Sequence, residues 1–539
     1  MTKIVYFFTI VLLFFQLISC NNSKDYVEMI PADADFVIQV NPKSLVEKGD
    51  LGVLNQFQFG KLALDEINSS DIKLKELMTE IIEKPTSFGL DVISPIYVFG
   101  KKENNKLIST LITNVRDKKD FEAQLKTIFQ TVYKTDIEFE EKDGYTQIKN
   151  QQKPFIRWNK NQFYFIAGEY GLNTTELEAY FNQLIKNENS LKENNSFSDF
   201  LKKTQDVNIW YTAKFINYFT KNPENNMQDI DYSKCAWATY LSFNSDNISF
   251  TQKFHPDPET KVKLEKRPMW KSKINTDFYK YFPAESFFNF SFAIHPTNTR
   301  YILNNDNPIT NFLANYEVND SILVDSFEGE LLFNVFDFKA AQNVDINDYF
   351  QKNENFTKKS VVPQFVLAGR MKNKNFYNHM IEKFGTSVKN EGQYYSLFLN
   401  AHNSLYFSYK YNILYITNNR KQLDLFTLNR VEKFNFIQSE FSNRAKNSMF
   451  GYVNLNLDDY SQETKDYVLS QLPFGNQTEV QTLLHQFSNI EYNVTDEYTK
   501  SGTLNFKKGD KNTLNRLLIS LDQVYQLFLT PQNPQNGSN

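Results

Sequence analysis

The residues with the clearest potential for chemistry are three short segments that together could form a serine acyl-enzyme site. Ser70 and Lys73 have the S-x-x-K spacing, which supplies a nucleophilic hydroxyl and a lysine. Ser245-Asp246-Asn247 matches the S-D-N element, and Lys500-Ser501-Gly502 resembles the K-T-G element. The order of the three segments along the chain is the order that this chemistry requires.

Together the three segments resemble the signature of penicillin-binding proteins and β-lactamases, but their spacing argues against a single active site. Ser70 and Ser245 lie 175 positions apart, and Ser245 and Lys500 lie 255 apart, which is longer than in those families. The second and third segments also fall in nearly equivalent turns of a repeated module. Ser70 is better explained as the N-cap of a helix through Leu74 and Leu77. A serine acyl-enzyme hydrolase is therefore an alternative that we do not favour.

The histidines and cysteines do not form a metal-binding pattern. No two histidines have the i, i+4 spacing of a zinc-protease helix, and no Cys-x-x-Cys occurs. His255, Asp257 and Glu259 could supply three ligands, but Pro256 and Pro258 favour an exposed turn there. We therefore expect no metal, no cofactor and no catalytic residue. The other histidines are His295, His379, His402 and His485.

Charged and aromatic clusters are the remaining candidates for a site. Glu138-Phe139-Glu140-Glu141 precedes an Asp143-Gly144 turn, and a solvated hairpin explains its charges. Aromatic residues make up 16% of the chain and could line a surface for a lipid, glycan or peptide. Most of them must pack in the core. Trp158, Trp210 and Tyr211 are the candidates for an exposed patch.

The elements that must position these residues belong to a module that the sequence repeats. Four landmarks recur in the same order, at offsets between 251 and 255 positions: Pro31 and Pro283, Phe121 and Phe376, Tyr164 and Tyr415, Phe254 and Phe506. Four matches in one order are poorly explained by a general abundance of aromatic strands. We therefore predict a tandem duplication.

Each copy is predicted to be α+β, mainly an antiparallel sheet with a few packed amphipathic helices. The strands alternate apolar and polar residues, as expected for a sheet with one solvated face. Ser44 and Glu47 have the capping-box spacing of a helix after the first strand, and Thr175 opens another helix. The other predicted elements are strands at 36–40, 111–113, 156–158 and 163–165 with a helix at 121–132, and strands at 288–292, 365–367, 407–409 and 414–416 with a helix at 376–384.

The predicted domain organisation follows from the repeat. Copy one spans 20–255, a basic linker with prolines spans 256–275, and copy two spans 276–510. An amphipathic helix at 511–530 is expected to cover a face or edge of copy two. The polar tail at 531–539 is expected to be disordered.

The N-terminus indicates a secreted and lipid-anchored protein. Lys3 precedes an apolar run from Ile4 to Ile18, and this run is shorter than the ~20 residues of a membrane-spanning helix. Leu17-Ile18-Ser19-Cys20 resembles the lipobox of bacterial lipoproteins. Residues 1–19 are therefore predicted to be the signal peptide, and Cys20 the site of lipid attachment. The other cysteine, Cys235, is expected to be a buried thiol.

The segments Ile30-Pro31-Ala32-Asp33-Ala34 and Val40-Asn41-Pro42-Lys43-Ser44-Leu45 resemble the start of large lipoproteins of unknown function from Bacteroidota. This resemblance implies an envelope lipoprotein in the outer membrane and supplies no catalytic residues. Surface export in that group uses a charged signal after the lipidated cysteine, which Asn21-Asn22-Ser23-Lys24-Asp25 matches in part. Exposure to the periplasm or to the cell surface stays open.

The predicted function is therefore that of a non-enzymatic, lipid-anchored cell-envelope protein that binds a protein, glycan or lipid partner. The alternative is a carrier or chaperone for lipid or lipoprotein cargo, which an apolar cavity would favour. The formal net charge of −4 does not indicate binding to nucleic acid. The membrane is the expected partner of the lipid on Cys20.

Overall fold

The computed structural model describes most of the chain, and its contacts divide it into two compact units. Unit 1 comprises residues 1–260 together with 508–539, and unit 2 comprises residues 261–507. The described residues are 26–51, 57, 88–91, 94–103, 106–132, 134–149, 155–169, 172–218, 230–271, 273–298, 317, 320–344, 357–400, 403–431, 434–439, 441–472 and 478–529.

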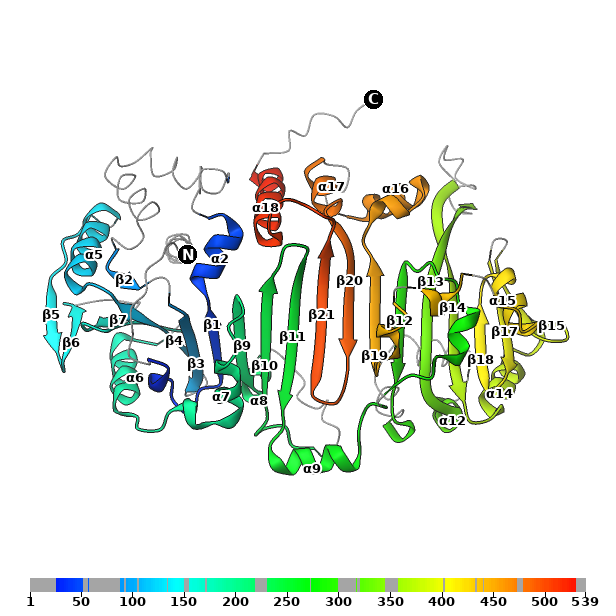
Figure 1. The fold of residues 1–539 in the computed structure, drawn as a ribbon, viewed down its shortest axis with the longest axis horizontal. Helices are drawn as coiled ribbons and strands as arrows, with labels where there is room; N and C mark the ends of the chain where they lie inside the picture. The colour runs from blue at the N-terminus through cyan, green and yellow to red at the C-terminus, as the bar shows by residue number, and fades with distance from the viewer. Residues whose placement is uncertain are drawn as a thin grey trace. The chain divides into compact units, whose positions relative to one another are not determined.

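Unit 1 is built on an antiparallel sheet (Figure 1). A short strand, β2 (Leu90–Asp91), also pairs with β4. In spatial order the other strands are β11 (Asn247–His255), β10 (Ala236–Phe243), β9 (Val207–Thr212), β1 (Phe36–Val40), β3 (Ile96–Glu103), β4 (Lys106–Val115), β8 (Gln162–Gly168), β7 (Phe155–Trp158), β6 (Tyr145–Ile148) and β5 (Phe139–Lys142).

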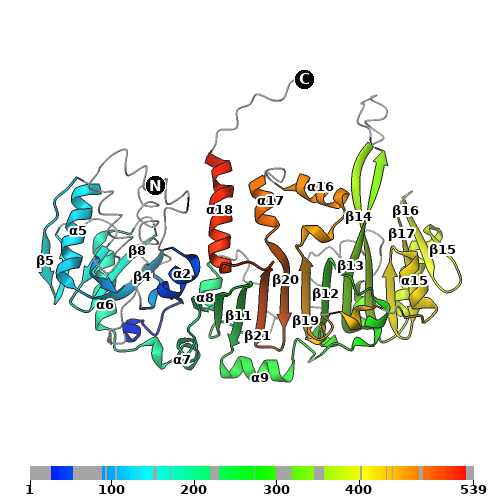
Figure 2. The same cartoon turned by 45° about the horizontal axis from the view of Figure 1, so that its top comes forward.

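Unit 2 also has an antiparallel sheet, and its strands are arranged in the same order, relative to their order in the chain, as those of unit 1. The hairpin of β13 and β14 extends beyond the neighbouring strands, as Figure 2 shows. In spatial order the strands are β21 (Thr499–Phe506), β20 (Phe487–Val494), β19 (Met449–Asn454), β12 (Phe288–Ala293), β13 (Phe327–Val344), β14 (Thr357–Met371), β18 (Ile413–Thr417), β17 (Asn403–Lys410), β16 (Tyr395–Asn400) and β15 (Val388–Asn390).

Helices pack on these sheets and connect their strands, which confirms the predicted α+β class with antiparallel sheet. Unit 1 carries α2 (Pro42–Gly49), α5 (Lys118–Val132), α6 (Thr174–Lys186), α7 (Asn195–Leu201), α8 (Ala213–Ile216) and α18 (Thr513–Leu529), with short 3-10 turns η1 (Tyr26–Met29) and η4 (Leu191–Glu193). Unit 2 carries α12 (Asp320–Ser326), α14 (Asn375–Phe384), α15 (Arg420–Thr427), α16 (Gln462–Gln471) and α17 (Thr478–Leu484), with 3-10 turns that include η5 (Thr276–Tyr281), η8 (Phe436–Gln438) and η9 (Arg444–Lys446).

The sheet of unit 1 is covered on both faces near β7. Phe155 belongs to a core that includes Phe181 of α6, whereas Ile156 and Trp158 belong to a second core that includes Phe121 of α5. Successive side chains of a strand point to opposite faces. All four residues of β7 are therefore buried. Ile156 and Trp158 make one face of the strand apolar, and Phe155 and Arg157 make the other face mixed.

The start of α2 differs from the prediction. Asn41, not Ser44, caps the helix, because the Asn41 side chain accepts a hydrogen bond from the backbone N–H of Ser44 at 3.3 Å. Pro42 then occupies the first helical turn, where its missing N–H has no consequence. Ser44 lies inside the helix, and its hydroxyl is free to bond elsewhere.

Two other segments differ from the prediction: the segment between the two predicted copies and the C-terminal helix. Part of the predicted linker forms a helix, α9 (Pro258–Lys266), which Asp257 caps through the N–H groups of Glu259 and Thr260. The C-terminal helix α18 was expected on copy two but groups with unit 1, where Asn515 donates a hydrogen bond to the carbonyl of Gly49 at 2.8 Å. No helix within the described ranges is long and apolar enough to cross a membrane.

Candidate functional site

The acyl-enzyme segments are only partly described, and those that are described have structural roles. Ser245 and Asp246 are exposed in the turn between β10 and β11, and the Asn247 side chain accepts a hydrogen bond from Asn244 at 2.8 Å. Lys500-Ser501-Gly502 lies within β21, not in a turn, and belongs to unit 2. Ser70 and Lys73 lie outside the described residues. Serine acyl transfer therefore stays an unfavoured prediction of the sequence.

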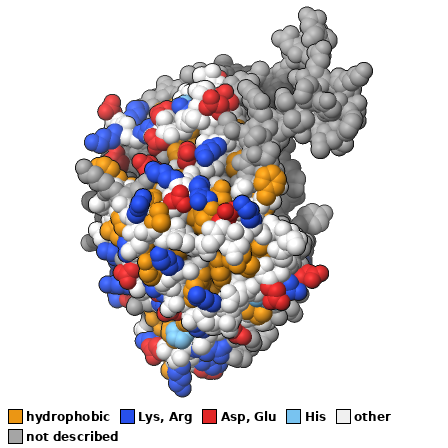
Figure 3. All heavy atoms as spheres, turned by 90° about the vertical axis from the view of Figure 1, so that its right-hand side faces the viewer, with side chains coloured by type: hydrophobic (Ala, Val, Ile, Leu, Met, Phe, Trp, Pro, Cys, Tyr) orange, Lys and Arg blue, Asp and Glu red, His pale blue; other side chains and the backbone are white. Residues whose placement is uncertain are grey.

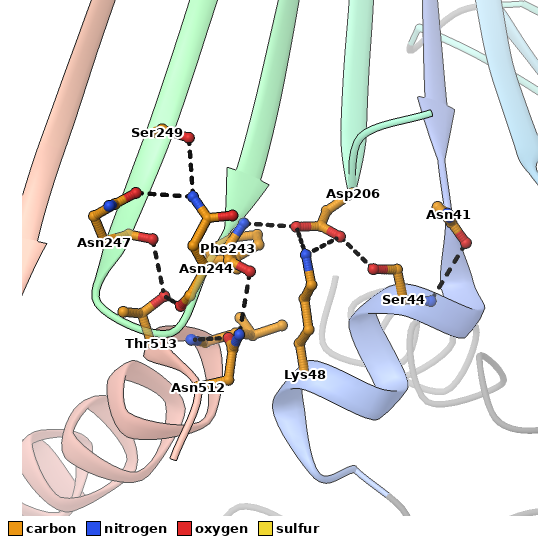
Figure 4. Close-up of polar contacts among 11 residues, drawn as sticks. Asn41, Ser44, Lys48, Asp206, Phe243, Asn244, Asn247, Ser249, Asn512 and Thr513 are labelled. Carbon is orange, nitrogen blue, oxygen red and sulfur yellow. Dashed lines mark hydrogen bonds and ion pairs between the residues drawn. The ribbon is translucent and has the colours of Figure 1, made fainter. Parts of the chain in front are cut away.

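The buried carboxylate of Asp206, the residue just before β9 in unit 1, is contacted by several polar groups (Figure 4). Its side chain is 2% exposed and accepts hydrogen bonds from the Ser44 hydroxyl, from Lys48 at 2.7 and 2.9 Å, and from the N–H of Phe243 at 2.6 Å. The carbonyl of Asp206 accepts from the N–H of Asn41 at 2.9 Å. The cluster therefore ties α2 to β9 and β10.

The same geometry argues against nucleophilic catalysis by Ser44. A lysine acts as a general base only when its amine is neutral, whereas the Lys48 amine is paired with the Asp206 carboxylate at 2.7 Å. The Ser44 hydroxyl donates to that carboxylate. Both groups are therefore engaged in holding α2 in place.

The N-terminal end of α18 closes the neighbouring β10–β11 turn, as Figure 4 also shows. The Thr513 hydroxyl donates to the carbonyl of Asn244 at 2.8 Å, and the Asn512 amide donates to the carbonyl of Phe243 at 3.2 Å. Thr513 is fully buried. Asn247 of the S-D-N segment is thus part of a structural turn that the C-terminal helix completes.

The residues proposed as metal ligands do not converge. Asp257 is committed to capping α9, and its second oxygen accepts a hydrogen bond from the Cys235 thiol at 3.4 Å. Burial lowers the pKa of His255, which favours the neutral imidazole. Among the described residues, no three His, Cys, Asp or Glu side chains lie close enough to hold a metal ion. His402 lies outside them.

Two of the three aromatic side chains considered for an exposed patch are core residues. Trp158 is fully buried, and its indole N–H donates to Glu122 at 3.0 Å. Trp210 is 2% exposed and donates to the Ser196 hydroxyl at 3.0 Å. Tyr211 is half-buried and stacks on Trp237 with ring centroids 5.9 Å apart. Trp158 and Trp210 therefore contribute no exposed aromatic surface, whereas Tyr211 is partly accessible.

A cavity of about 590 Å³ lies in unit 1, beside the segment that leads into β1. One wall is the loop Pro31-Ala32-Asp33, a second is Lys101 of β3, and a third is the C-terminal half of α6 with the residues that follow it. The lining residues from α6 onward are Tyr180, Asn182, Gln183, Leu184, Lys186, Asn187 and Asn189.

Backbone hydrogen bonds fix the cavity walls against each other. Pro31 forms an isolated bridge with Ser190, and the N–H of Ala32 donates to the carbonyl of Asn189 at 3.0 Å. The N–H of Leu191 donates to the carbonyl of Ile30 at 2.9 Å. The loop before β1 and the segment after α6 are therefore joined as in a short sheet.

Side chains of both charge signs line the cavity, and apolar atoms make up most of its surface. Lys101 forms an ion pair with Asp33 at 2.9 Å and lies over the Tyr180 ring, 5.8 Å from its centroid. Burial raises the pKa of Tyr180, so its hydroxyl stays protonated and can donate. Gln183 and Asn187 are exposed and add amide groups, which donate and accept at the same time. Such a lining suits an uncharged or zwitterionic polar ligand.

The sequence identified parts of this cavity without bringing them together. Pro31 stood out as a landmark of the repeat, Ala32 and Asp33 as part of the lipoprotein resemblance, and Thr175 as the start of the helix that lines the cavity. Nothing in the local pattern indicated that the end of α6 would meet the loop before β1, because their bridge joins residues 159 positions apart, Pro31 and Ser190. Cys20 lies outside the described residues, so its predicted lipidation stays a prediction.

Comparisons with known proteins cover most of the described region. A family model described as "Domain of unknown function (DUF4836)" matches residues 26–514. The search of curated proteins and the search of solved structures gave no match. The matched region runs from η1 into the first turn of α18, so it includes the cavity and both sheets.

Proposed function

Because the chain belongs to the DUF4836 family, which is defined as a domain of unknown function, we propose its role from its own residues. We infer that it is a non-enzymatic binding protein, anchored by lipid in a bacterial cell envelope of the Bacteroidota type. Its cavity in unit 1 is the observation that carries the binding role. The cavity lies beside the Pro31-Ala32-Asp33 segment on which the lipoprotein resemblance rests.

We further propose that units 1 and 2 are tandem copies of one module. Their strand orders correspond position by position, and equivalent backbone hydrogen bonds recur, with the partner near the first strand displaced by 252 positions and the other partner by 242 to 245. The corresponding pairs are Leu191 N–H to Ile30 O and Phe436 N–H to Phe282 O, Asn41 N–H to Asp206 O and Ala293 N–H to Ser448 O, and Thr212 N–H to Asp35 O and Asn454 N–H to Phe287 O.

The anchoring proposal predicts that Cys20→Ala releases the protein from membranes. Several acyl chains on one cysteine hold a protein far more firmly than one chain does, so removing the attachment site should transfer most of it to the soluble fraction. The measurement is fractionation of cells that produce the full chain, with a carbonate wash of the membranes. Cys235→Ala is the control, since that thiol is buried and unconnected to the anchor. Retention of Cys20→Ala in washed membranes would show that something else anchors the chain.

The binding proposal concerns a polar, hydroxyl-rich ligand, such as a glycan of the envelope. Small-molecule sites commonly measure about 300–1,000 Å³, and this cavity falls in that range. The amide groups of Gln183 and Asn187 offer the paired donors and acceptors that sugar hydroxyls need. Eight of the eleven residues that line the cavity have polar or charged side chains, which favours a glycan, whose apolar C–H faces suit the apolar part of the surface, over a lipid acyl chain.

Filling the cavity should abolish glycan binding without unfolding the protein. Gln183 is exposed on α6, so Gln183→Trp adds bulk to the cavity and removes no buried contact. The matched control is Glu188→Trp, an exposed position on the same segment that does not line the cavity. The full chain is tested on an array of bacterial cell-wall and outer-membrane saccharides. We expect a saccharide signal that Gln183→Trp lowers at least about tenfold and Glu188→Trp leaves intact. Equal signals from both variants would remove the cavity as the site.

A further inference from the structure

The segment after α15 in unit 2 exposes large apolar side chains at a regular spacing. Leu428, Val431, Phe434 and Ile437 are 48%, 49%, 69% and 45% exposed. We call these four residues the apolar loop. Scattered single apolar residues are normal on protein surfaces, but four within ten positions form a patch that needs an explanation.

The corresponding segment of unit 1 shows that the fold does not require this patch. After α6, residues 187–194 read Asn-Glu-Asn-Ser-Leu-Lys-Glu-Asn. Leu191, the one large apolar residue among them, points inward and is 2% exposed. Both segments make the same backbone bridge, Pro31 with Ser190 in unit 1 and Pro283 with Asn435 in unit 2. The exposed apolar side chains are therefore an addition of unit 2.

Two buried residues in the same segment, Asn435 and Phe436, fix the direction in which the side chains of the apolar loop point. Phe436 is fully buried and packs against Tyr279, with ring centroids 5.0 Å apart. Asn435 is 6% exposed, and its side chain accepts a hydrogen bond from the N–H of Ile437 at 3.1 Å. These two residues occupy the inner side of the segment. Phe434 and Ile437, on either side of them, are consequently directed toward solvent.

The part of the sequence that contains the apolar loop is rich in basic residues. The stretch 410–446 contains seven Lys or Arg and three Asp or Glu, although the whole chain has a net charge of −4. Arg430 is exposed between Leu428 and Val431, Lys421 is exposed at the start of α15, and the Lys410 amine donates to the carbonyl of Thr427 at 2.7 Å. Figure 3, which views unit 2 from the side of β15 and β17, shows hydrophobic patches between Lys and Arg side chains.

We propose that the apolar loop inserts into the interface of a lipid bilayer with anionic headgroups. Apolar side chains next to Lys and Arg are the combination that binds such an interface: the apolar groups enter the acyl boundary and the cations stay at the headgroups. This contact would be additional to the lipid predicted on Cys20, and it does not depend on ligand binding in unit 1.

The test places an environment-sensitive thiol-reactive dye on the loop itself. Phe434→Cys is made in the full chain carrying Cys20→Ala, so the remaining native thiol is Cys235, which is buried. Phe398→Cys is the matched control, because Phe398 is also a phenylalanine of unit 2 that is 69% exposed. The proteins are mixed with vesicles of phosphatidylethanolamine and phosphatidylglycerol that carry brominated acyl chains, which quench a dye only inside the bilayer.

We expect a blue-shifted emission and a several-fold stronger quenching at position 434 than at position 398. Replacing phosphatidylglycerol with phosphatidylcholine should weaken the quenching at 434, and Arg430→Gln should weaken the loop's partitioning about fivefold, as the loss of one cation near the surface predicts. A dye at 434 that is quenched no more than the dye at 398 would overturn the proposal. Because the probe reports the loop alone, binding through the N-terminus cannot produce the expected result.

Discussion

Replacing Arg157 with methionine is expected to lower the free energy of unfolding of unit 1 by about 3 kcal/mol. The side chain is fully buried in β7, and its guanidinium donates to Gln147 at 2.7 Å and to Glu178 at 2.6 Å. It also lies between the Phe155 and Phe181 rings, 5.0 and 4.8 Å from their centroids. Removing one partner of a buried ion pair costs more than the pair contributes, because the other partner loses its compensation.

The expected loss lies at the lower end of the range for buried pairs. Glu178 is 26% exposed and keeps a second partner, Lys142, at 2.5 Å, so its carboxylate is not left without a cation. Methionine replaces most of the aliphatic volume between the two phenylalanine rings, which limits the cavity. The main cost is the loss of hydrogen bonds to Gln147, which is 8% exposed.

Tryptophan fluorescence during urea unfolding measures this effect, because Trp158, Trp210 and Trp237 all lie in unit 1. Lys202→Met is the matched control, since it also replaces a cation by methionine but in an exposed pair with Asp199. Exposed pairs contribute little, so the control should unfold at the wild-type urea concentration. Equal midpoints for Arg157→Met and wild type would contradict the account.

The free energy of unfolding measured at acidic pH provides a second test. Hydrogen bonding from Lys142 and then from Arg157 lowers the pKa of Glu178, although burial opposes this. A carboxyl whose pKa is lowered on folding contributes stability above its unfolded pKa and loses it as the pH falls through the folded pKa. The contribution should therefore be present above the ordinary glutamate pKa of 4.5 and be lost as the pH falls through the lower pKa of the folded state. In Arg157→Met the acid-dependent part should be smaller than in wild type.

Local sequence patterns predicted where the strands of this fold lie in the chain, but not which strands pair with each other in the sheet. The strand at Phe36–Val40 was predicted with its bounds, because alternation of apolar residues marks a strand wherever it lies. Alternation does not say which strand comes next to it. β1 pairs with β9, whose Val207 lies opposite Val40, and that contact is separated by 167 positions. Only the repeat carried information about such long-range pairing.

Polar residues were harder to predict because their partners are distant. Ser44 has capping-box spacing, yet it bonds to Asp206, 162 positions away, while Asn41 caps the helix. The cavity poses the same difficulty, since Asp33 and Lys101 are brought together by the pairing of β1 with β3. The sequence therefore identified residues of the candidate site but could not assemble it. The hydrophobic spacing of α18 predicted a helix correctly, and its expected position on copy two was wrong.

The polar residues at the start of α18 explain why it packs on unit 1, and they predict the effect of removing it. A chain that ends at Asp510 loses the hydrogen bonds from Asn512, Thr513 and Asn515 to carbonyls of the β10–β11 turn and of α2. Each bond contributes about 1 kcal/mol net, so unit 1 should lose about 3 kcal/mol or more. The burial of Leu514, which is 9% exposed, adds to this loss.

The loss should be concentrated in α2, because a helix of eight residues is not stable without tertiary contacts. Hydrogen exchange read by mass spectrometry should show the amides of Pro42–Gly49 exchanging about 100-fold faster in the chain ending at Asp510. A chain ending at Leu529 is the control, since it keeps all of α18 and loses only the residues after it. Asn515→Ala should give a smaller acceleration, of several-fold, because it removes one bond. Unchanged exchange in α2 after removal of α18 would show that Asp206, Ser44 and Lys48 hold the helix by themselves.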